Sequence, residues 1–420
     1  MMTFFAAPHL WWWGRDLPSL RYAFVSGFIL LAAVVLQSSG GRPTLGVPTK
    51  SRLPSIAALA MVINATFIHY VLAADRGISL DTYVELLKFV VLYFLMMSAI
   101  RDRRDLQIVL VAMAFGAGYL GYEVTINERG TFTAGRLEGV GAPGADTANG
   151  LASMLLLVLP LIGSLFMDGK RWHKILVMLG APMALNVILM CNSRGAFLGL
   201  VGGAIVFLFL ARGPSRKHAI RTLILGGAAL YLLMGDPKIL ERFTTTFVGA
   251  EERDRSAASR IEFWKAGLVM LQDYPLGAGG GSFKFVFADR YLARVGSDQK
   301  ARALHNGYLT EATDWGVQGL FLKILFLVGA CAMALKTVNR CRKAGRAEDA
   351  LVGVAFVAGL SSFLISCMFG SYLANEWAYW VAAILVRYSE IYAVEGAVAE
   401  LAPSPARQLQ GSKRTREAVA

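Results

Sequence analysis

Long apolar runs recur along the whole chain and are separated by short polar segments. Each run approaches the roughly 20 residues that a helix needs to cross a bilayer. The pattern predicts about eleven membrane-spanning helices, and a twelfth if a further helix lies at or before the N-terminal segment. The expected spans are 20–37, 54–73, 81–99, 106–124, 150–167, 173–190, 194–211, 218–234, 317–335, 350–369 and 376–392.

One long polar stretch, 235–316, interrupts this pattern. A structureless loop of that length is unusual, and functional lids are the common exception. A helix is expected over 256–274, ended by Pro275 and Gly277. Aromatic side chains in the stretch can build a small core of their own. They are Phe243, Phe247, Phe263, Trp264, Phe283, Phe285, Phe287 and Tyr291.

The composition agrees with a membrane protein, because 55% of the 420 residues are hydrophobic and 17% are charged. Soluble domains usually carry about 25% charged residues. We therefore predict an all-α fold, a polytopic transmembrane bundle with one large loop containing short helices. The expected parts are N-terminal spans in 1–234, the loop in 235–316, C-terminal spans in 317–392 and a disordered cytoplasmic tail in 393–420.

The net charge of +13 lies mainly in every second loop between apolar runs. Lys and Arg in short loops stay on the cytoplasmic side, so this pattern sets topology and does not indicate nucleic-acid binding. The segments 125–149, 192–194 and 235–316 then share the non-cytoplasmic face. The basic residues assigned to the cytoplasm are Arg42, Lys50, Arg52, Arg101, Arg103, Arg104, Lys170, Arg171, Lys174, Arg212, Arg216, Lys217, Arg221, Lys336, Arg340, Arg342, Lys343 and Arg346.

Three arginines on the non-cytoplasmic face are candidate anion ligands: Arg136, Arg194 and Arg260. Arg194 opens an apolar helix, where free amides and the helix dipole favour anions, and guanidinium matches phosphate with two hydrogen bonds. Each has a simpler interpretation. Arg194 can be an interfacial side chain that reaches the headgroups, Arg136 a solvated loop charge, and Arg260 a surface ion pair with Glu262 or Asp254.

His305 is a candidate general base, because imidazole titrates near neutral pH and can take a proton from a hydroxyl. A lone histidine beside a helix start can equally be structural. The residues together indicate more than each alone, since several cations and a base suit a diphosphate leaving group and a hydroxyl acceptor. A lipid-linked substrate would explain why such a site lies in a membrane protein.

Other motifs do not indicate a functional site. The glycine-rich run 277–282 lacks the phosphate-loop pattern and is interpreted as a flexible turn. The aspartates of the long loop lack metal-loop spacing, so no metal and no cofactor is expected. The four cysteines show no CxxC spacing and are interpreted as small core residues or free thiols.

Several motifs, in this order, resemble the O-antigen ligase-like membrane proteins, which include O-antigen ligases, Wzy-type polymerases and O-glycosylation ligases. They are Ser-Arg-Gly-Ala at 193–196, Ser-Arg-Ile-Glu-Phe-Trp at 259–264, Asp-Tyr-Pro-Leu-Gly-Ala-Gly at 273–279, His-Asn-Gly-Tyr-Leu at 305–309 and Trp-Gly-Val-Gln-Gly at 315–319. The resemblance extends from about residue 101 to 392.

The resemblance implies a membrane glycosyltransferase that needs no metal or nucleotide. It implies a bacterial inner-membrane protein whose loop covers a cavity for undecaprenyl diphosphate-linked glycan on the periplasmic face. By resemblance, Arg194 and Arg260, with Arg136 beside them, bind the diphosphate, and His305 activates the acceptor hydroxyl. Transfer would proceed with inversion to a lipid, polysaccharide or protein acceptor.

The rival hypothesis is a transporter or flippase that binds an anionic or lipid-linked substrate with the same arginines. Transporters usually place broken helices and polar residues at the middle of the membrane. The expected spans contain few ionisable residues, among them Glu85, Lys88, Lys323 and Arg387, so the polar residues concentrate in the loop. This distribution favours the enzyme.

Overall fold

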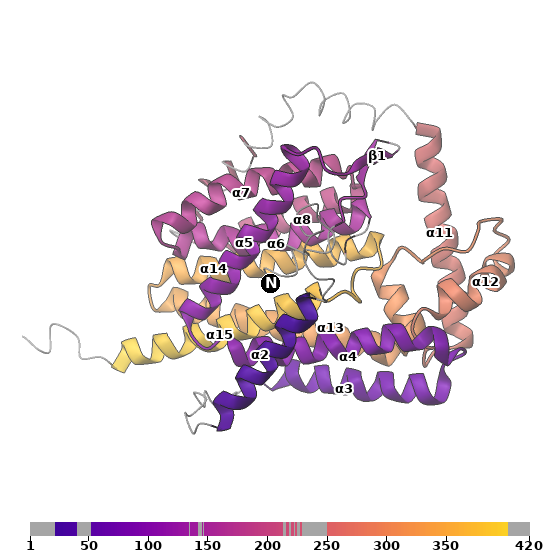
Figure 1. The fold of residues 1–420 in the computed structure, drawn as a ribbon, viewed down its shortest axis with the longest axis horizontal. Helices are drawn as coiled ribbons and strands as arrows, with labels where there is room; N and C mark the ends of the chain where they lie inside the picture. The colour runs from indigo at the N-terminus through magenta and orange to yellow at the C-terminus, as the bar shows by residue number, and fades with distance from the viewer. Residues whose placement is uncertain are drawn as a thin grey trace, which may run out of the picture.

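The computed structural model describes residues 22–39, 52–133, 135–141, 145, 147–212 and 250–401, with 216–217, 220–221, 223–224 and 227–228. The axes of most of the long helices lie roughly along one common line, and α11 and α12 lie at one end of the bundle (Figure 1). We call this the loop end. The helices are α2 (Tyr22–Ser39), α3 (Leu53–Phe67), η3 (Ile68–Leu72), α4 (Arg76–Ala99), α5 (Arg103–Thr125), α6 (Ala148–Asp168), α7 (Arg171–Met190), α8 (Arg194–Leu210), α11 (Ala250–Asp273), η4 (Phe283–Phe287), α12 (Ala288–Arg294), α13 (Gly307–Lys343), α14 (Ala347–Ser366), η5 (Cys367–Phe369) and α15 (Trp377–Leu401).

The predicted all-α membrane bundle is confirmed. Within the described residues, 7 helices are long and apolar enough to cross a membrane. The other predicted spans coincide with the shorter α2 and α8 and with α15, except for 218–234, which lies largely outside the described residues. Helix α15 continues to Leu401, past the expected end of the bundle at 392, and the rest of the expected tail, 402–420, is outside the description.

Short polar residues start the helices where the sequence changes from loop to apolar run. Asp75, Thr147 and Ser193 cap α4, α6 and α8 by accepting hydrogen bonds from backbone amides in each first turn. Such caps satisfy amides that have no partner within the helix. The first residue of α8 is therefore Arg194, as the sequence predicts.

Glycines let the helices approach closely. A Cβ placed at Gly199 of α8 would lie 2.6 Å from the carbonyl oxygen of Ser362 in α14. A Cβ at Gly121 of α5 would lie 2.6 Å from the backbone of Met183 in α7. Small residues at helix contacts are the usual means of association in lipid, where apolar burial gives little driving force.

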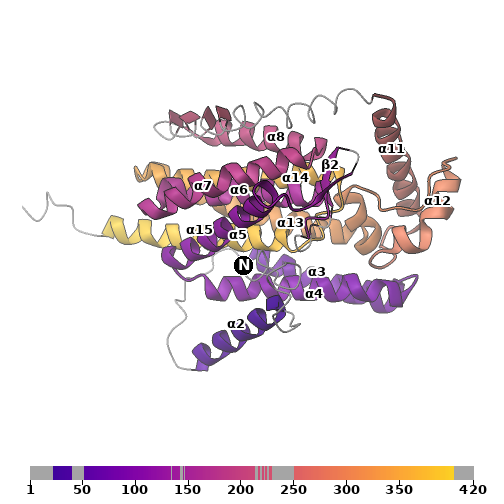
Figure 2. The same cartoon turned by 45° about the horizontal axis from the view of Figure 1, so that its top comes forward.

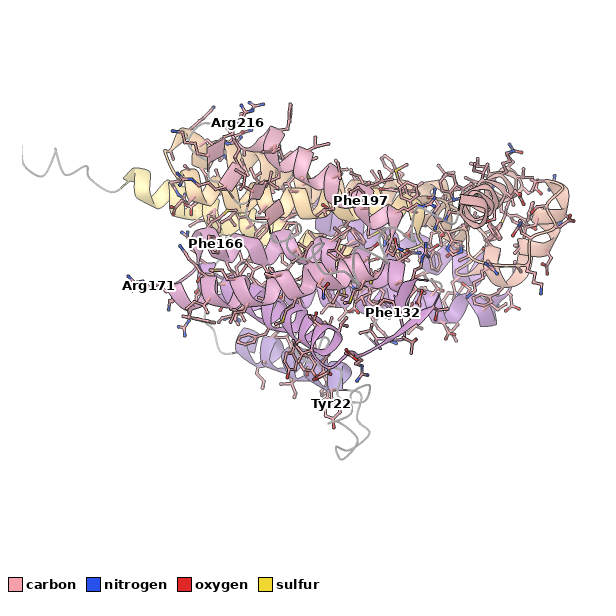
Figure 3. The ribbon with its side chains drawn as sticks, turned by 90° about the horizontal axis from the view of Figure 1, so that it is seen from above. Tyr22, Phe132, Phe166, Arg171, Phe197 and Arg216 are labelled. Atoms are coloured by element: carbon pink, nitrogen blue, oxygen red, sulfur yellow. The ribbon has the colours of Figure 1, made fainter. Side chains whose placement is uncertain are left out.

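An ionic network joins the helices at the end opposite the loop. Arg103 of α5 binds Asp168 of α6 and also Asp349 of α14, the latter at 2.7 Å. Arg346 also binds Asp349 at 2.6 Å, and the hydroxyl of Tyr392 donates to Asp168 at 2.8 Å. The labelled Arg171 and Arg216 lie toward this end, whereas Phe132 lies nearer the loop end (Figure 3). Basic residues assigned to one face are thus at one end of the bundle.

The loop has its own small core, formed by α11, η4, α12 and the segment before α13. Phe263, Phe283, Phe287 and Tyr291 are buried there, as expected, with Met270, Leu292 and Leu304. Phe285 was expected in this core but is 63% exposed. Phe243 and Phe247 lie outside the described residues. The predicted helix over 256–274 is confirmed as part of α11, which ends at Asp273 just before Pro275.

Helix α13 is broken at Gly316, where φ is 77° and ψ is 170°. Its first segment, Gly307 to Trp315, comes from the end of the predicted loop. The glycine-rich run holds this break: the Ala278 amide donates to the Thr313 carbonyl at 3.0 Å and the Gly279 amide to the Asp314 carbonyl at 3.1 Å. The run was expected to be a flexible turn; it is instead a hydrogen-bonded clasp on the break.

A buried ion pair lies across the same break. The Lys323 ammonium is 3.4 Å from the Glu311 carboxylate, and it donates to the Tyr379 hydroxyl at 2.8 Å and the Leu373 carbonyl at 3.4 Å. All three of its partners belong to different parts of the chain. The pair therefore joins both segments of α13 to α15 and to the connection before α15.

The two ends of the bundle provide a test of topology. We expect a cysteine at the exposed Asp298, in the loop, to react with a membrane-impermeant maleimide in intact cells. A cysteine at the exposed Ala344, between α13 and α14, should react only after permeabilisation. The wild-type chain is the background control, because Cys191, Cys341 and Cys367 are buried and Cys331 is partly buried. The opposite labelling pattern would reverse the orientation inferred from the charged loops.

Candidate active site

Three arginines from distant parts of the chain meet at the loop end. Arg136 lies on β2 (Arg136–Glu138), Arg194 at the start of α8 and Arg260 on α11. Burial lowers the pKa of Arg260, and the nearby charge of Arg136 and then that of Arg194 lower it further. Like charges lower the pKa of a cation in this way when they lie near it. The three predicted anion ligands are therefore close in space. The hairpin and α11 lie at this end in the second view also (Figure 2).

No carboxylate compensates these charges within the described residues, where none of the three arginines forms an ion pair. The acidic residues near them have other partners. Glu138 accepts from the Ala148 amide at 3.0 Å at the start of α6, and Glu262 accepts from the Ser297 hydroxyl. The proposed surface pair between Arg260 and Glu262 is thus absent, and the side chain of Asp254 is outside the description. Arg136 and Arg260 are partly buried and Arg194 is exposed, and cations without a carboxylate partner are a suitable site for an anion.

A short antiparallel hairpin positions Arg136. Strand β1 (Thr131–Thr133) pairs with β2 so that Phe132 faces Leu137, and Leu137 is buried. Because side chains alternate along a strand, Arg136 points to the face opposite Leu137. The side-chain amide of Asn192 donates to the Gly135 carbonyl at 3.4 Å. This contact ties the hairpin to the turn before Arg194.

His305 lies at the end of the loop in a strained backbone conformation. Its φ is 51°, in the left-handed region that residues other than glycine rarely adopt. The helix cap is Asn306, whose side-chain oxygen accepts from the amides of Tyr308 and Leu309 at 3.0 and 3.2 Å. Capping of α13 therefore does not require the imidazole. Strained residues held by surrounding contacts are common at functional sites.

The neighbours of His305 fix its protonation state. The ring meets Phe263 edge to face, with centroids 6.3 Å apart, and the Trp264 indole donates to the Leu304 carbonyl at 3.1 Å. Burial lowers the pKa of the imidazole, and the positive charges of Arg260, Arg302 and Lys284 lower it further. The ring is therefore neutral at pH 7 and has a lone pair that can accept a proton.

The connection between α14 and α15, which no sequence motif marked, also lies at this site. The segment 369–373 lies against the first turns of three helices, each at a glycine. A Cβ at Gly195 would lie 2.7 Å from Phe369, one at Gly150 would lie 3.6 Å from Tyr372, and one at Gly307 would lie 2.9 Å from Leu373. The ring of Tyr372 is in the electrostatic field of Arg260 and Arg136.

Burial raises the pKa of the Tyr372 phenol, so this side chain is a protonated hydrogen-bond donor at neutral pH. Sequence reasoning placed it in a short connection between spans, and no motif marked it. The available signal was its place between two spans on the same face as the long loop. Among the described residues no three His, Cys, Asp or Glu side chains gather into a metal-binding group, so we name no metal ligands.

Comparison with known proteins finds similarity to membrane proteins of polysaccharide biosynthesis. The profile of the family described as O-Antigen ligase matches residues 179–324, which include Arg194, Arg260 and His305 but neither Arg136 nor Tyr372. The chain is also 24% identical over 210 residues to the teichuronic acid biosynthesis protein TuaE of Bacillus subtilis (strain 168). That match covers 48% of this chain and 42% of the relative, so the chain matches less than half of that protein. The resemblance indicated by the motifs is confirmed.

The charges around His305 lead to a prediction for its titration. In the detergent-solubilised protein with labelled histidine, we expect the His305 imidazole to titrate below its ordinary pKa of about 6.5. Arg260→Gln should raise this pKa, because Arg260 is the largest of the charges that depress it. His305→Gln assigns the signal. Arg294→Gln is the control, since Arg294 is paired with Asp273 and is not among the charges that lower the His305 pKa. A wild-type pKa at or above 6.5 would contradict the prediction.

Proposed function

We propose that this chain, an O-antigen ligase-like membrane protein, transfers a glycan from an undecaprenyl diphosphate-linked donor to an acceptor hydroxyl. The acceptor oxygen attacks the anomeric carbon of the donor sugar, and its proton passes to His305. The bond between that carbon and the phosphate oxygen breaks, and undecaprenyl diphosphate leaves. Attack from the face opposite the leaving group inverts the anomeric configuration. The chemistry uses side chains only, without a metal or cofactor.

The observation that carries this proposal is a group of uncompensated arginines beside a neutral imidazole. Diphosphate is an anion, and the planar guanidinium group binds phosphate oxygens with two parallel hydrogen bonds. Preorganised cations stabilise the negative charge that develops on the leaving group, and this is usually the largest catalytic effect. Arg136, Arg194 and Arg260 supply the charge. Because its pKa is lowered, His305 is neutral at pH 7, and its imidazole is the base.

The location of the residues supports a lipid-linked donor. They lie at the loop end of a bundle whose helices are long enough to cross a membrane. A diphosphate at this level would leave its polyprenyl chain among the helices and its glycan under the loop. We assign the loop end to the periplasmic face of the bacterial inner membrane, because the basic loops lie at the other end. The acceptor hydroxyl can belong to a lipid, a polysaccharide or a protein.

A second candidate is a flippase for the same lipid, and one observation favours it. Helix α13 is discontinuous and carries the buried Glu311–Lys323 pair, features that transporters use at their substrate sites. The pair is engaged with Tyr379 and Leu373, so it already has protein partners. A flippase would move lipid-linked glycan in proteoliposomes without an acceptor. The transferase would release undecaprenyl diphosphate only when an acceptor is present.

The arginines can be tested by matched substitutions. We expect Arg194→Ala and Arg260→Ala to abolish transfer, and the corresponding Lys variants to restore little activity. Lysine carries the charge but lacks the planar fork that binds phosphate in two places. Arg290→Ala on α12 is the control, because this exposed arginine belongs to the same loop. Transfer of glycan from the lipid-linked donor is measured in purified protein. Full activity of either Lys variant would show that bulk positive charge is sufficient.

His305 can be tested separately from donor binding. General-base catalysis typically contributes about 10²–10⁴-fold, so His305→Ala should lower the transfer rate by that order. Donor binding should be nearly unchanged, because the arginines hold the diphosphate. His305→Gln should be no more active, since an amide cannot take the proton.

The rate of the wild-type protein should fall as the pH drops through the His305 pKa, because protonation removes the base. Wild-type rates in His305→Gln would eliminate the general-base role. Melting temperatures of all variants distinguish lost chemistry from lost folding.

A further inference from the structure

The short helix η4 turns three side chains away from the loop core. Phe283 and Phe287, at its two ends, are buried in that core. Lys284, Phe285 and Val286 lie between them and are exposed, with 63% of Phe285 and 38% of Val286 accessible. One turn of helix therefore carries an apolar tip and a cation on the outside of the loop.

This turn of helix is attached to the connection between two membrane-crossing helices. The first of these spans ends at Leu72 and the next begins at Arg76, so residues 73–75 alone join them. Each span needs most of its length to cross a bilayer, because about 20 residues are required. The connection 73–75 therefore lies close to the membrane surface. It is at the same end of the bundle as α12 in both views (Figures 1 and 2).

Two hydrogen bonds fix the glycine-rich run, which directly precedes η4, to this connection. The Ala74 amide donates to the Ala278 carbonyl at 2.9 Å. The Gly280 amide donates to the hydroxyl oxygen of Ser79, in the first turn of α4, at 3.1 Å. The start of η4 is thus held at the level where α4 enters the membrane.

The Phe285 ring lies beside that first turn. A Cβ placed at Gly281 would be 3.2 Å from the Phe285 ring and 3.5 Å from the side chain of Ile78. Ile78 is the third residue of α4 and is about 3 Å along the helix axis from its first residue. The exposed ring is therefore next to the outermost part of a span.

The surrounding side chains have the composition of a membrane interface. Tyr70 and Val71, at the end of the first span, are 54% and 62% exposed. The exposed Arg76 donates to the Tyr70 carbonyl, and the Lys284 ammonium is 4.5 Å from the centroid of the Phe285 ring. Aromatic rings are enriched at the headgroup level, where Lys and Arg place their charged ends in the polar layer. The lipid-facing surface of the spans thus continues onto η4.

We propose that η4 anchors the loop to the lipid leaflet at the loop end. Phe285 and Val286 enter the boundary between headgroups and acyl chains, and Lys284 pairs with a lipid phosphate. The partner is a phospholipid surface, because an apolar tip with an adjacent cation matches acyl chains below anionic headgroups. The anchor is independent of the reaction, so it remains if the chain is a flippase. It holds the loop core at the membrane surface.

Nitroxide labels can measure the environment of η4 in the full chain. The label is attached to Phe285→Cys in nanodiscs of phosphatidylglycerol and phosphatidylethanolamine. Its relaxation is measured with oxygen, which concentrates in lipid, and with a neutral nickel chelate, which stays in water. We expect the ratio of oxygen to chelate accessibility to approach that of Ile63→Cys, on the 71% exposed position of α3. It should be well above that of Asp298→Cys, an exposed loop position.

Two further variants extend the test. Val286→Cys should give the same result, and it serves if Phe285→Cys does not fold. Lys284→Glu, combined with labelled Val286→Cys, places a negative charge against the headgroups and should make the label more accessible to the chelate, whereas Lys284→Arg should not. An unchanged label in the Lys284→Glu variant would overturn the phosphate pairing. The unsubstituted chain gives the background from its native cysteines, and melting temperatures show which variants are folded.

Each result at position 285 decides for or against the anchor. Chelate accessibility equal to that of Asp298→Cys places the side chain in water and overturns the proposal. Little accessibility to either reagent means that protein covers the tip. Broadening by a second nitroxide, lost on dilution with unlabelled chain, identifies that protein as another copy. Both of these outcomes also overturn it. High oxygen and low chelate accessibility at 285 and 286 supports it.

Discussion

The break in α13 at Gly316 is the constraint on which the site depends. Glu311 and Lys323 are far apart in sequence, and a continuous helix would separate them by about 18 Å along its axis. Their side chains nevertheless approach to 3.4 Å, which is possible because the helix is interrupted between them. The positive φ of Gly316 permits the interruption, and the glycine clasp satisfies the backbone groups that it frees. The first segment of α13 can then bring His305 to the arginines.

Glycines also allow close backbone contact around the site. The connection 369–373 reaches the first turns of α6, α8 and α13, and a side chain at Gly195 or Gly307 would push it away, whereas a Cβ at Gly150 would be in ordinary contact with Tyr372. Three helix starts, each with partial positive charge, therefore surround one short segment. Arg194 and Tyr372 are positioned by these backbone contacts, whereas Arg136 is held by the hairpin and Arg260 by α11, which packs in the loop core.

Sequence reasoning predicts the parts of this molecule that depend on local composition. Apolar runs locate the helices, and short motifs identify Arg194, Arg260 and His305, since each is next to a recognisable helix start or helix body. The glycine-rich run 277–282 was predicted to be a flexible turn. It is held by hydrogen bonds to Thr313 and Asp314, which are distant in sequence and which no local pattern reveals. Tyr372 was missed for the same reason: its surroundings come from three distant helix starts. The exposed Phe285 shows that aromatic content alone does not define a core.

One charge performs two tasks in this arrangement. In the proposed function Arg260 binds an anion, and the same guanidinium lowers the pKa of the His305 imidazole. Coupling between two binding events is reciprocal, so an anion that offsets Arg260 must also strengthen proton binding at His305 by an equal free energy. Occupancy and basicity are thus thermodynamically linked. The imidazole is a weak base while the arginines are bare and becomes a stronger one when they are neutralised, so proton uptake accompanies arrival of the anion.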